Sequence, residues 1–487
     1  MHDAAGANCV WTGFVDISRS RAEIWKDCRL IAWSKIPGVV VIGVACLAPL
    51  PYGSTEYGWI CVWLGILAAS VVSRAWSAPL PSNRIPIFTI CALGFGLTCL
   101  VAFQVSTRVP GILIHPAWKT ASENGISDVV GRLAIEAVAP VYALALPFAV
   151  LMAFLAGYLY ASRRLWCWSL VKALVIAGVI YASLGVFLGV VTPGYVLFER
   201  KIAYENDFTG TFINRNTAAD YFGVCFLAAA ALAFRELRQN WPTGYLPTKE
   251  KLIFLVQNLT SGTTFWSLIA AALLAAVLLT GSRAGAAFSV FGAVVLLFLL
   301  IRKMGQANRI ALLGAAGAAA LIVLQLFGTG NLLTRVSEGL NENGRYRGWS
   351  SALEIIKDQP FFGTGLGTFK IAFPSYRQGE RGTMQIWEQA HSTPLELAVE
   401  LGLPATSILF GLWGLALVSL FRSYLREGDA YALPALGFSV MLLAGLHSLV
   451  DFPLQIPGCV IPIAIMLGAI IRISSQNARA AQFMSPA

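Results

Sequence analysis

Residues 265–301 read FWSLIAAALLAAVLLTGSRAGAAFSVFGAVVLLFLLI, and this stretch decides the fold. Two apolar runs, 265–281 and 285–301, flank a short tip whose one charged residue is Arg283. A bilayer core about 30 Å thick needs roughly 20 apolar residues of helix, because a helix satisfies its own backbone polar groups. The stretch therefore predicts two membrane-spanning helices joined by a tight turn.

The same pattern recurs along the whole chain of 487 residues, which is 57% hydrophobic and only 12% charged. That balance leaves too little polar surface for a soluble globule of this size. We predict an all-α polytopic membrane protein with about twelve transmembrane helices. The expected spans are 36–51, 58–73, 85–103, 138–160, 168–191, 217–234, 265–281, 285–301, 310–327, 394–421, 432–450 and 456–472.

Basic residues predict the orientation, because short cytoplasmic loops are enriched in Lys and Arg. They gather in alternate short loops, while the short loops of the other set contain only Arg283. Both termini belong to the basic set, so we expect both in the cytoplasm of a cell with an inner membrane. The net charge of +10 is thus explained by topology, and we predict no nucleic-acid partner. The basic loop residues are Arg74, Arg84, Arg163, Arg164, Arg302, Lys303, Arg309, Arg422 and Arg426.

The predicted organisation has four parts. They are a cytoplasmic segment 1–35 without a removable signal peptide, transmembrane helices 1–5 in 36–200, a core in 201–472, and a cytoplasmic tail 473–487. Nine cysteines fall in apolar runs or predicted cytoplasmic segments, so no disulfide framework is expected.

Long outer segments are expected at 104–137, 192–216 and 328–390, and long loops are uncommon unless they have a function. The last lies between the ninth and tenth spans and predicts a periplasmic helical domain. It contains an amphipathic pattern and then the turn-rich FFGTGLGTF at 361–369. Those glycines follow no strand of a βαβ unit, so a nucleotide loop is excluded. The apolar face of the pattern is Tyr346, Trp349, Leu353 and Ile356.

Two arginines lie at the predicted outer boundary. Arg283 could grip phosphate oxygens bidentately, or it could extend to lipid headgroups. Arg215 precedes the span at 217–234 and could serve a pyrophosphate together with Arg283. The alternative is structural: Arg215 pairs with Asp207 or Asp220, while Asn216 or Thr217 caps the helix.

His391 precedes the span at 394–421 in WEQAHSTPLELAVELG. Thr393 as N-cap, Pro394 at the first helical position and Glu396 three residues after the cap predict a helix start. Glu396 is therefore assigned to capping. His391 has no such task and is a candidate general base or phosphate donor, the alternative being an ordinary hydrogen-bonding residue.

His447 and Asp451 are four residues apart in HSLVDFPLQIPG and share one face if the helix continues. They could orient one another or the loop that carries His391. No second close ligand pair accompanies them, so no metal site is predicted.

The segments FINRNTAADYFG, LLTGSRAG, WSSALEIIKDQPFFGTGLGTF, AHSTPLELAVELG and HSLVDFPLQIP occur in this order over roughly 205–465. They resemble the O-antigen ligase and polymerase superfamily. The resemblance implies metal-independent glycosyl transfer from an undecaprenyl-pyrophosphate-linked glycan at the periplasmic face, with no cofactor. It also implies that Arg215 and Arg283 hold the pyrophosphate and that His391 is essential near the reacting centre. Many members have Asn after that histidine, whereas this chain has Ser392.

We expect substrate-binding roles for the neighbouring polar residues Asn214, Asn216, Glu388, His447 and Asp451. The predicted partners are the lipid-linked donor, a lipid- or glycan-linked acceptor and membrane lipids. Ligation to lipid A–core and polymerisation of repeat units remain open, with protein glycosylation a more distant choice. The alternative class is a transporter or flippase of lipid-linked glycan, for which Lys172 and Glu400 inside spans are the best indications.

Overall fold

The computed structural model describes residues 36–201, 203–240, 262–304, 343–377, 387–426, 428 and 430–483. Within these residues, nine helices are long and apolar enough to cross a membrane. Helix Ile36–Leu47 and α17 (Ala432–Ser448) are apolar but shorter. The nine are α2 (Tyr57–Ser77), α3 (Ile85–Val105), the pair α5 (Ala139–Ala143) and α6 (Ala145–Tyr160), α7 (Arg164–Val191), α8 (Arg215–Asn240), α10 (Gly262–Leu279), α11 (Arg283–Arg302), α16 (Thr393–Arg426) and α18 (Pro457–Phe483).

The predicted fold class is confirmed: the chain is an all-α polytopic membrane protein. Eleven of the twelve predicted spans correspond to these helices, and the twelfth, 310–327, lies outside the described residues. The described strands are β1 (Tyr195–Val196) and its antiparallel partner β2 (Glu199–Arg200). The remaining helices are η1 (Tyr52–Ser54), η2 (Gly111–Leu113), α4 (Pro116–Glu123), α14 (Asn343–Asp358), α15 (Phe369–Ala372), η4 (Phe373–Tyr376) and η5 (Pro453–Gln455).

Helix α8 is the buried centre of the bundle, in contact with α7, α10, α11 and α17. Its inner half is rich in alanine, which lets neighbouring helices approach closely. Helix α18 packs along α6 in the same way. A Cβ on Gly157 would overlap the carbonyl oxygen of Ile465, and a Cβ on Gly468 would overlap that of Phe154. Small residues therefore set the tight crossings of the core.

Helix α16 is interrupted at Gly402, whose φ of 80° and ψ of 166° are not helical. The glycine-rich run enters this break. The N–H groups of Thr364 and Gly365 donate to the carbonyls of Val399 and Glu400 at 2.8 and 3.1 Å. Buried Gln104 of α3 also donates to the Glu400 carbonyl, at 2.8 Å. Backbone groups released by the break are thus satisfied by protein, as a helix at membrane depth requires.

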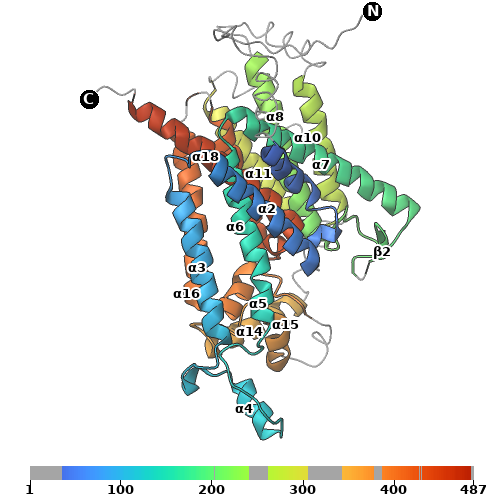
Figure 1. Cartoon of the computed structure of the whole chain (residues 1–487). Helices are drawn as coiled ribbons and strands as arrows, with labels where there is room; N and C mark the ends of the chain where they lie inside the picture. The colour runs from blue at the N-terminus through green and yellow to red at the C-terminus, as the bar shows by residue number, and fades with distance from the viewer. Residues whose placement is uncertain are drawn as a thin grey trace, which may run out of the picture.

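The segment α14 to η4 forms a small layer at one end of the bundle (Figure 1). Trp349 Nε1 donates to the carbonyl of Ala390 at 3.0 Å, and Ala352, Ile355 and Ile356 are buried against the start of α16. The amphipathic helix was predicted, but Leu353 is 48% exposed. The inward face follows 352, 355 and 356 at helical spacing and excludes it. The side chain of Tyr346 lies outside the described part.

Candidate active site

The three residues predicted to be catalytic lie at helix starts. Arg215 is the first residue of α8, Arg283 is the first residue of α11, and His391 lies two residues before α16. The first N–H groups of a helix have no partner within it and carry a partial positive charge. A helix N-terminus therefore favours the binding of anions. Each of these residues places a guanidinium or an imidazole group at such an N-terminus.

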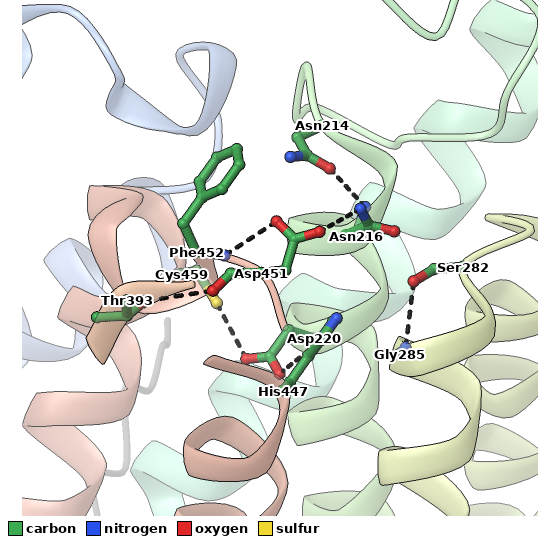
Figure 2. Close-up of polar contacts among 10 residues, drawn as sticks. All are labelled: Asn214, Asn216, Asp220, Ser282, Gly285, Thr393, His447, Asp451, Phe452 and Cys459. Atoms are coloured by element: carbon green, nitrogen blue, oxygen red, sulfur yellow. Dashed lines mark hydrogen bonds and ion pairs between the residues drawn. The ribbon is translucent and has the colours of Figure 1, made fainter. Parts of the chain in front are cut away.

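Side-chain caps fix two of these starts (Figure 2). Asn214 Oδ1 accepts a hydrogen bond from the Asn216 N–H at 2.7 Å, and Ser282 Oγ accepts one from the Gly285 N–H at 3.1 Å. The prediction that Asn216 or Thr217 caps α8 is wrong, because α8 already begins at Arg215 and Asn214 occupies the cap position.

Arg215 is joined to the segment before α8 and to the turn before α11. Its Nη1 lies 3.0 Å from Asp207 Oδ2, and its guanidinium lies 5.3 Å from the centre of the Tyr204 ring. A Cβ on Gly281 would lie 3.9 Å from the same Nη1. Of the two carboxylates considered from the sequence, Asp207 is thus the partner. Arg215 lies against the turn whose next helix begins with Arg283, which is exposed.

Asp207 is itself held between two cations. Lys201 Nζ donates to the Asp207 carbonyl at 2.7 Å, while the carboxylate faces Arg215. Burial lowers the pKa of Lys201, and the charge of Asp207 opposes that shift. Both Arg215 and Asp207 keep about a third of their side chains exposed, at 37% and 30%. The pair is therefore open to exchange with a solute anion.

Two polar pairs bridge α8 and the end of α17 (Figure 2). Asn216 Nδ2 donates to Asp451 Oδ2. His447, four residues before Asp451, pairs with Asp220, four residues after Asn216. Its Nδ1 lies 3.0 Å from Asp220 Oδ1, with both side chains fully buried. Cys459 Sγ contacts Asp220 Oδ2 at 3.5 Å.

Asp451 is the connecting residue of the site. Its Oδ1 lies 3.8 Å from His391 Nδ1, and its carbonyl accepts from Thr393 N–H and Oγ1 at 3.3 Å each. Of the two roles considered for the His447 and Asp451 pair, Asp451 serves the loop that carries His391, while His447 pairs with Asp220. Asp451 thereby ties His391 to the start of α8.

His391 has a backbone φ of 51°, and its ring lies between two aromatic rings. The ring centres of Trp387 and Phe452 are 5.6 and 5.1 Å away, and 26% of its side chain is exposed. An imidazole held this way has one nitrogen near a carboxylate and an edge open to solvent. That is the arrangement expected of a proton acceptor.

Two nearby glutamates differ in burial. Glu388 is exposed in the segment before His391. Glu396 is buried, and its Oε2 accepts from the Ala390 N–H at 2.7 Å. The assignment of Thr393 as N-cap is wrong, because α16 already begins at Thr393. In a capping box the acidic side chain accepts from the N–H of the cap residue itself, whereas Glu396 accepts from a backbone N–H further before the helix.

Residues 268–410 match the family model described as O-antigen ligase. This part of the chain is similar to the O-antigen ligase family. The matched part runs from α10 into α16 and includes Arg283 and His391, while Arg215 and Asp451 lie outside it. The match supports the superfamily indicated by the sequence motifs. No curated protein matches this chain.

Proposed function

We propose that this protein transfers glycan from an undecaprenyl-pyrophosphate-linked donor to a hydroxyl of a lipid- or glycan-linked acceptor at the periplasmic face. The observation that carries the proposal is the connected set Arg215, Asn216, Asp451 and His391, with Arg215 against the turn before Arg283. Two guanidinium groups at helix N-termini suit a diphosphate, and the imidazole lies on the other side of Asp451.

The reaction we propose is an inverting displacement. The acceptor oxygen forms a bond to the anomeric carbon as the bond from that carbon to the pyrophosphate oxygen breaks. His391 takes the hydroxyl proton, and Asp451 at 3.8 Å orients the imidazole and stabilises its charge. Arg215 and Arg283 stabilise the departing lipid pyrophosphate, a good leaving group, and the step is metal-independent. Asn214, Asn216 and Glu388 complete the proposed binding region. His447 was expected there from the sequence, but it is fully buried and pairs with Asp220, so its role is to hold α8 and α17 together.

The proposed location is the inner membrane, with both termini cytoplasmic. The basic loops support it, because Arg74, Arg163 and Arg302 follow or precede spans at the end of the bundle away from Arg215. The acceptor then approaches the layer α14 to η4, which packs against the start of α16 just after His391.

The two residues that best indicated the transporter alternative, Lys172 and Glu400, each have a partner within the helical bundle. Lys172 lies 5.8 Å from the centre of the Trp266 ring. Glu400 Oε1 accepts from the Phe369 N–H at 3.0 Å where the glycine-rich run meets α16. Both intramembrane charged residues therefore have packing roles that explain their positions without a transport pathway.

A donor-dependent transfer assay on purified protein tests the proposal. Arg283→Ala and His391→Ala should each lower the transfer rate roughly 100- to 1000-fold, because each removes a group that acts on charge developing in the transition state. Arg108→Ala removes an exposed arginine from another predicted outer segment and should leave the rate unchanged. Near-normal transfer by either site variant would refute its assignment.

Ligase and polymerase differ in what a deletion strain accumulates. Loss of capped lipopolysaccharide with accumulated long lipid-linked glycan identifies a ligase. Accumulation of single unpolymerised repeats identifies a polymerase. Glycan flux without transfer in a vesicle assay would instead favour the transporter class.

A further inference from the structure

His391 has a backbone conformation that residues with a side chain disfavour. Its φ of 51° lies in the left-handed region, which residues with a Cβ rarely adopt. Such a conformation persists only where the surrounding contacts hold it, and it is found most often at active sites. The contacts that hold His391 therefore identify residues on which its position depends.

The imidazole of His391 is not held by a hydrogen bond at Nδ1. This nitrogen is buried without a hydrogen-bond partner in the described part of the chain, and its separation of 3.8 Å from Asp451 Oδ1 is too long for such a bond. Asp451 can stabilise charge on the ring at this distance, but it does not fix the direction of the ring alone. That direction depends on the main chain at His391 and on the rings beside it.

Side chains from two different helices bind the main chain before His391. Trp349 Nε1 of α14 donates to the carbonyl of Ala390 at 3.0 Å. Glu396 Oε2, from the first turn of α16, accepts from the N–H of Ala390 at 2.7 Å. The carbonyl of Ala390 belongs to the same peptide group as the His391 nitrogen, so its bond to Trp349 fixes one side of the φ rotation of His391. Ala390 is fully buried, so water does not replace either bond.

The main chain after His391 is held from α16 and from the end of α17. The Glu396 N–H donates to the Ser392 carbonyl at 3.0 Å, and the Thr393 N–H donates to the Asp451 carbonyl at 3.3 Å. Hydrogen bonds thus restrain the chain on both sides of His391. Glu396 contributes to both sides, through its side chain before the histidine and through its backbone after it.

Helix α14 also holds the ring beside the imidazole. A Cβ on Gly348 would overlap Cζ3 of Trp387, so this glycine lets the Trp387 ring pack directly against the helix. The Trp387 ring stacks on that of Phe373 with centres 5.4 Å apart, and it lies perpendicular to the His391 ring at 5.6 Å. The consecutive residues Gly348 and Trp349 of α14 therefore contact both the ring and the main chain that position His391.

We propose that Trp349 and Glu396 are positioning residues for His391, whose left-handed main chain they hold through their hydrogen bonds to Ala390. The inference rests on the proposed function, in which His391 is the proton acceptor. A general base contributes only when its nitrogen lies within hydrogen-bond reach of the reacting hydroxyl, so loss of either bond slows the chemical step. Neither residue contacts the donor in this role, so donor binding is unaffected.

Chemical modification of His391 tests the role of Trp349 without requiring transfer activity. Trp349→Phe removes the indole N–H and keeps an aromatic ring. Ethoxycarbonylation of His391 by diethyl pyrocarbonate should become about 3- to 10-fold faster, the factor of one hydrogen bond, because release of the main chain exposes an imidazole that is 26% exposed in the wild type. Mass spectrometry of the digested full-length protein measures this rate. The matched control, Trp118→Phe, removes an indole N–H bonded to the Ala134 carbonyl at 2.8 Å and should leave the rate unchanged.

Transfer kinetics provide the second measurement. The kcat of Trp349→Phe should fall about 3- to 10-fold, with the KM for donor changed by about twofold or less. An unchanged modification rate of His391, relative to fully buried His447 in the same sample, would overturn the proposal, because Trp349 would then only pack α14 against the bundle. If the modification rate rises while His391→Ala keeps normal transfer, the positioning role stands and the proposed function fails.

Two substitutions of Glu396 test the other bond, and they keep the proposal testable if Trp349→Phe does not fold. Glu396→Gln keeps an oxygen that can accept the Ala390 N–H and should keep kcat within about threefold of the wild type. Glu396→Leu leaves that buried N–H without a partner and should lower kcat about 10- to 30-fold, with faster modification of His391. Equal effects of the two substitutions on both measurements would overturn the role of Glu396.

Discussion

The two ends of this helical bundle hold their cations differently. At the candidate active site the aromatic neighbours of Arg215 and His391 are joined by carboxylates, Asp207 with Arg215 and Asp451 near His391. At the opposite end cations lie over aromatic rings. Arg472 lies 5.6 Å from the centre of Tyr158, and Arg235 lies 4.8 Å from the centre of Trp168.

That difference has a physical consequence. A carboxylate neutralises a cation and fixes its direction, and it can be exchanged for another anion. An aromatic face attracts a cation through its quadrupole and leaves the charge in place. Carboxylate partners therefore suit groups that must be aligned and then meet a reactant. Aromatic partners suit groups that remain charged beside lipid phosphates.

We expect the largest effect on the free energy of unfolding from breaking the buried pair of His447 and Asp220 beside the candidate active site. His447→Ala leaves the carboxylate of Asp220 buried without its imidazole partner, which should lower the free energy of unfolding by about 3–5 kcal/mol. Thermal unfolding of the purified protein measures this change. The double variant Asp220→Asn/His447→Ala removes the charge as well and should recover part of the loss. Equal stability of the single and double variants would mean that the pairing of charge contributes little.

We expect the second largest effect on stability at the break in α16, where the glycine-rich run 361–369 forms hydrogen bonds with the helix. Gly402→Ala should destabilise the fold by about 1–3 kcal/mol, because φ is +80° and the new Cβ would overlap the carbonyl oxygen of Phe361. Hydrogen exchange should rise over residues 360–368. Gly411→Ala in the same helix is the control, since nothing lies within 4 Å of a Cβ there and alanine favours a helix. Unchanged exchange in Gly402→Ala would show that the run docks without this close approach.

The sequence predicted the helices and the ends at which Arg215, Arg283 and His391 lie, because both follow from local apolar runs and the polar residues that bound them. The partners within the site were not predictable in this way. Asn216 and Asp451 are 235 residues apart, and only the packing of α8 against α17 brings them together. A hint existed in the four-residue spacing of Asn216 with Asp220 and of His447 with Asp451, which matches one helical turn on each side.

The break in α16 at Gly402 could not be predicted from hydropathy either. Both halves of α16 are apolar, so hydropathy indicated one continuous span at 394–421. The turn-rich nature of FFGTGLGTF was evident, but its destination was not, because its hydrogen bonds run to Val399 and Glu400 through tertiary packing. Local patterns specify which backbone groups are irregular, whereas long-range contacts decide which partners satisfy them.

We expect the smallest effect on the KM for donor, and it tests whether Asp207 is an exchangeable or a permanent partner of Arg215. If the lipid pyrophosphate takes the place of Asp207 on Arg215, then Asp207→Asn removes a competitor, and the KM for donor should fall about two- to fivefold, the value of a partly exposed ion pair. The kcat should stay the same, because the transition-state contacts of Arg215 are kept. Glu205→Gln removes an exposed carboxylate two residues away and serves as the control for net charge. A higher KM in Asp207→Asn would show the opposite role, in which Asp207 holds Arg215 in its binding position, and the carboxylate would then be a permanent part of the donor site.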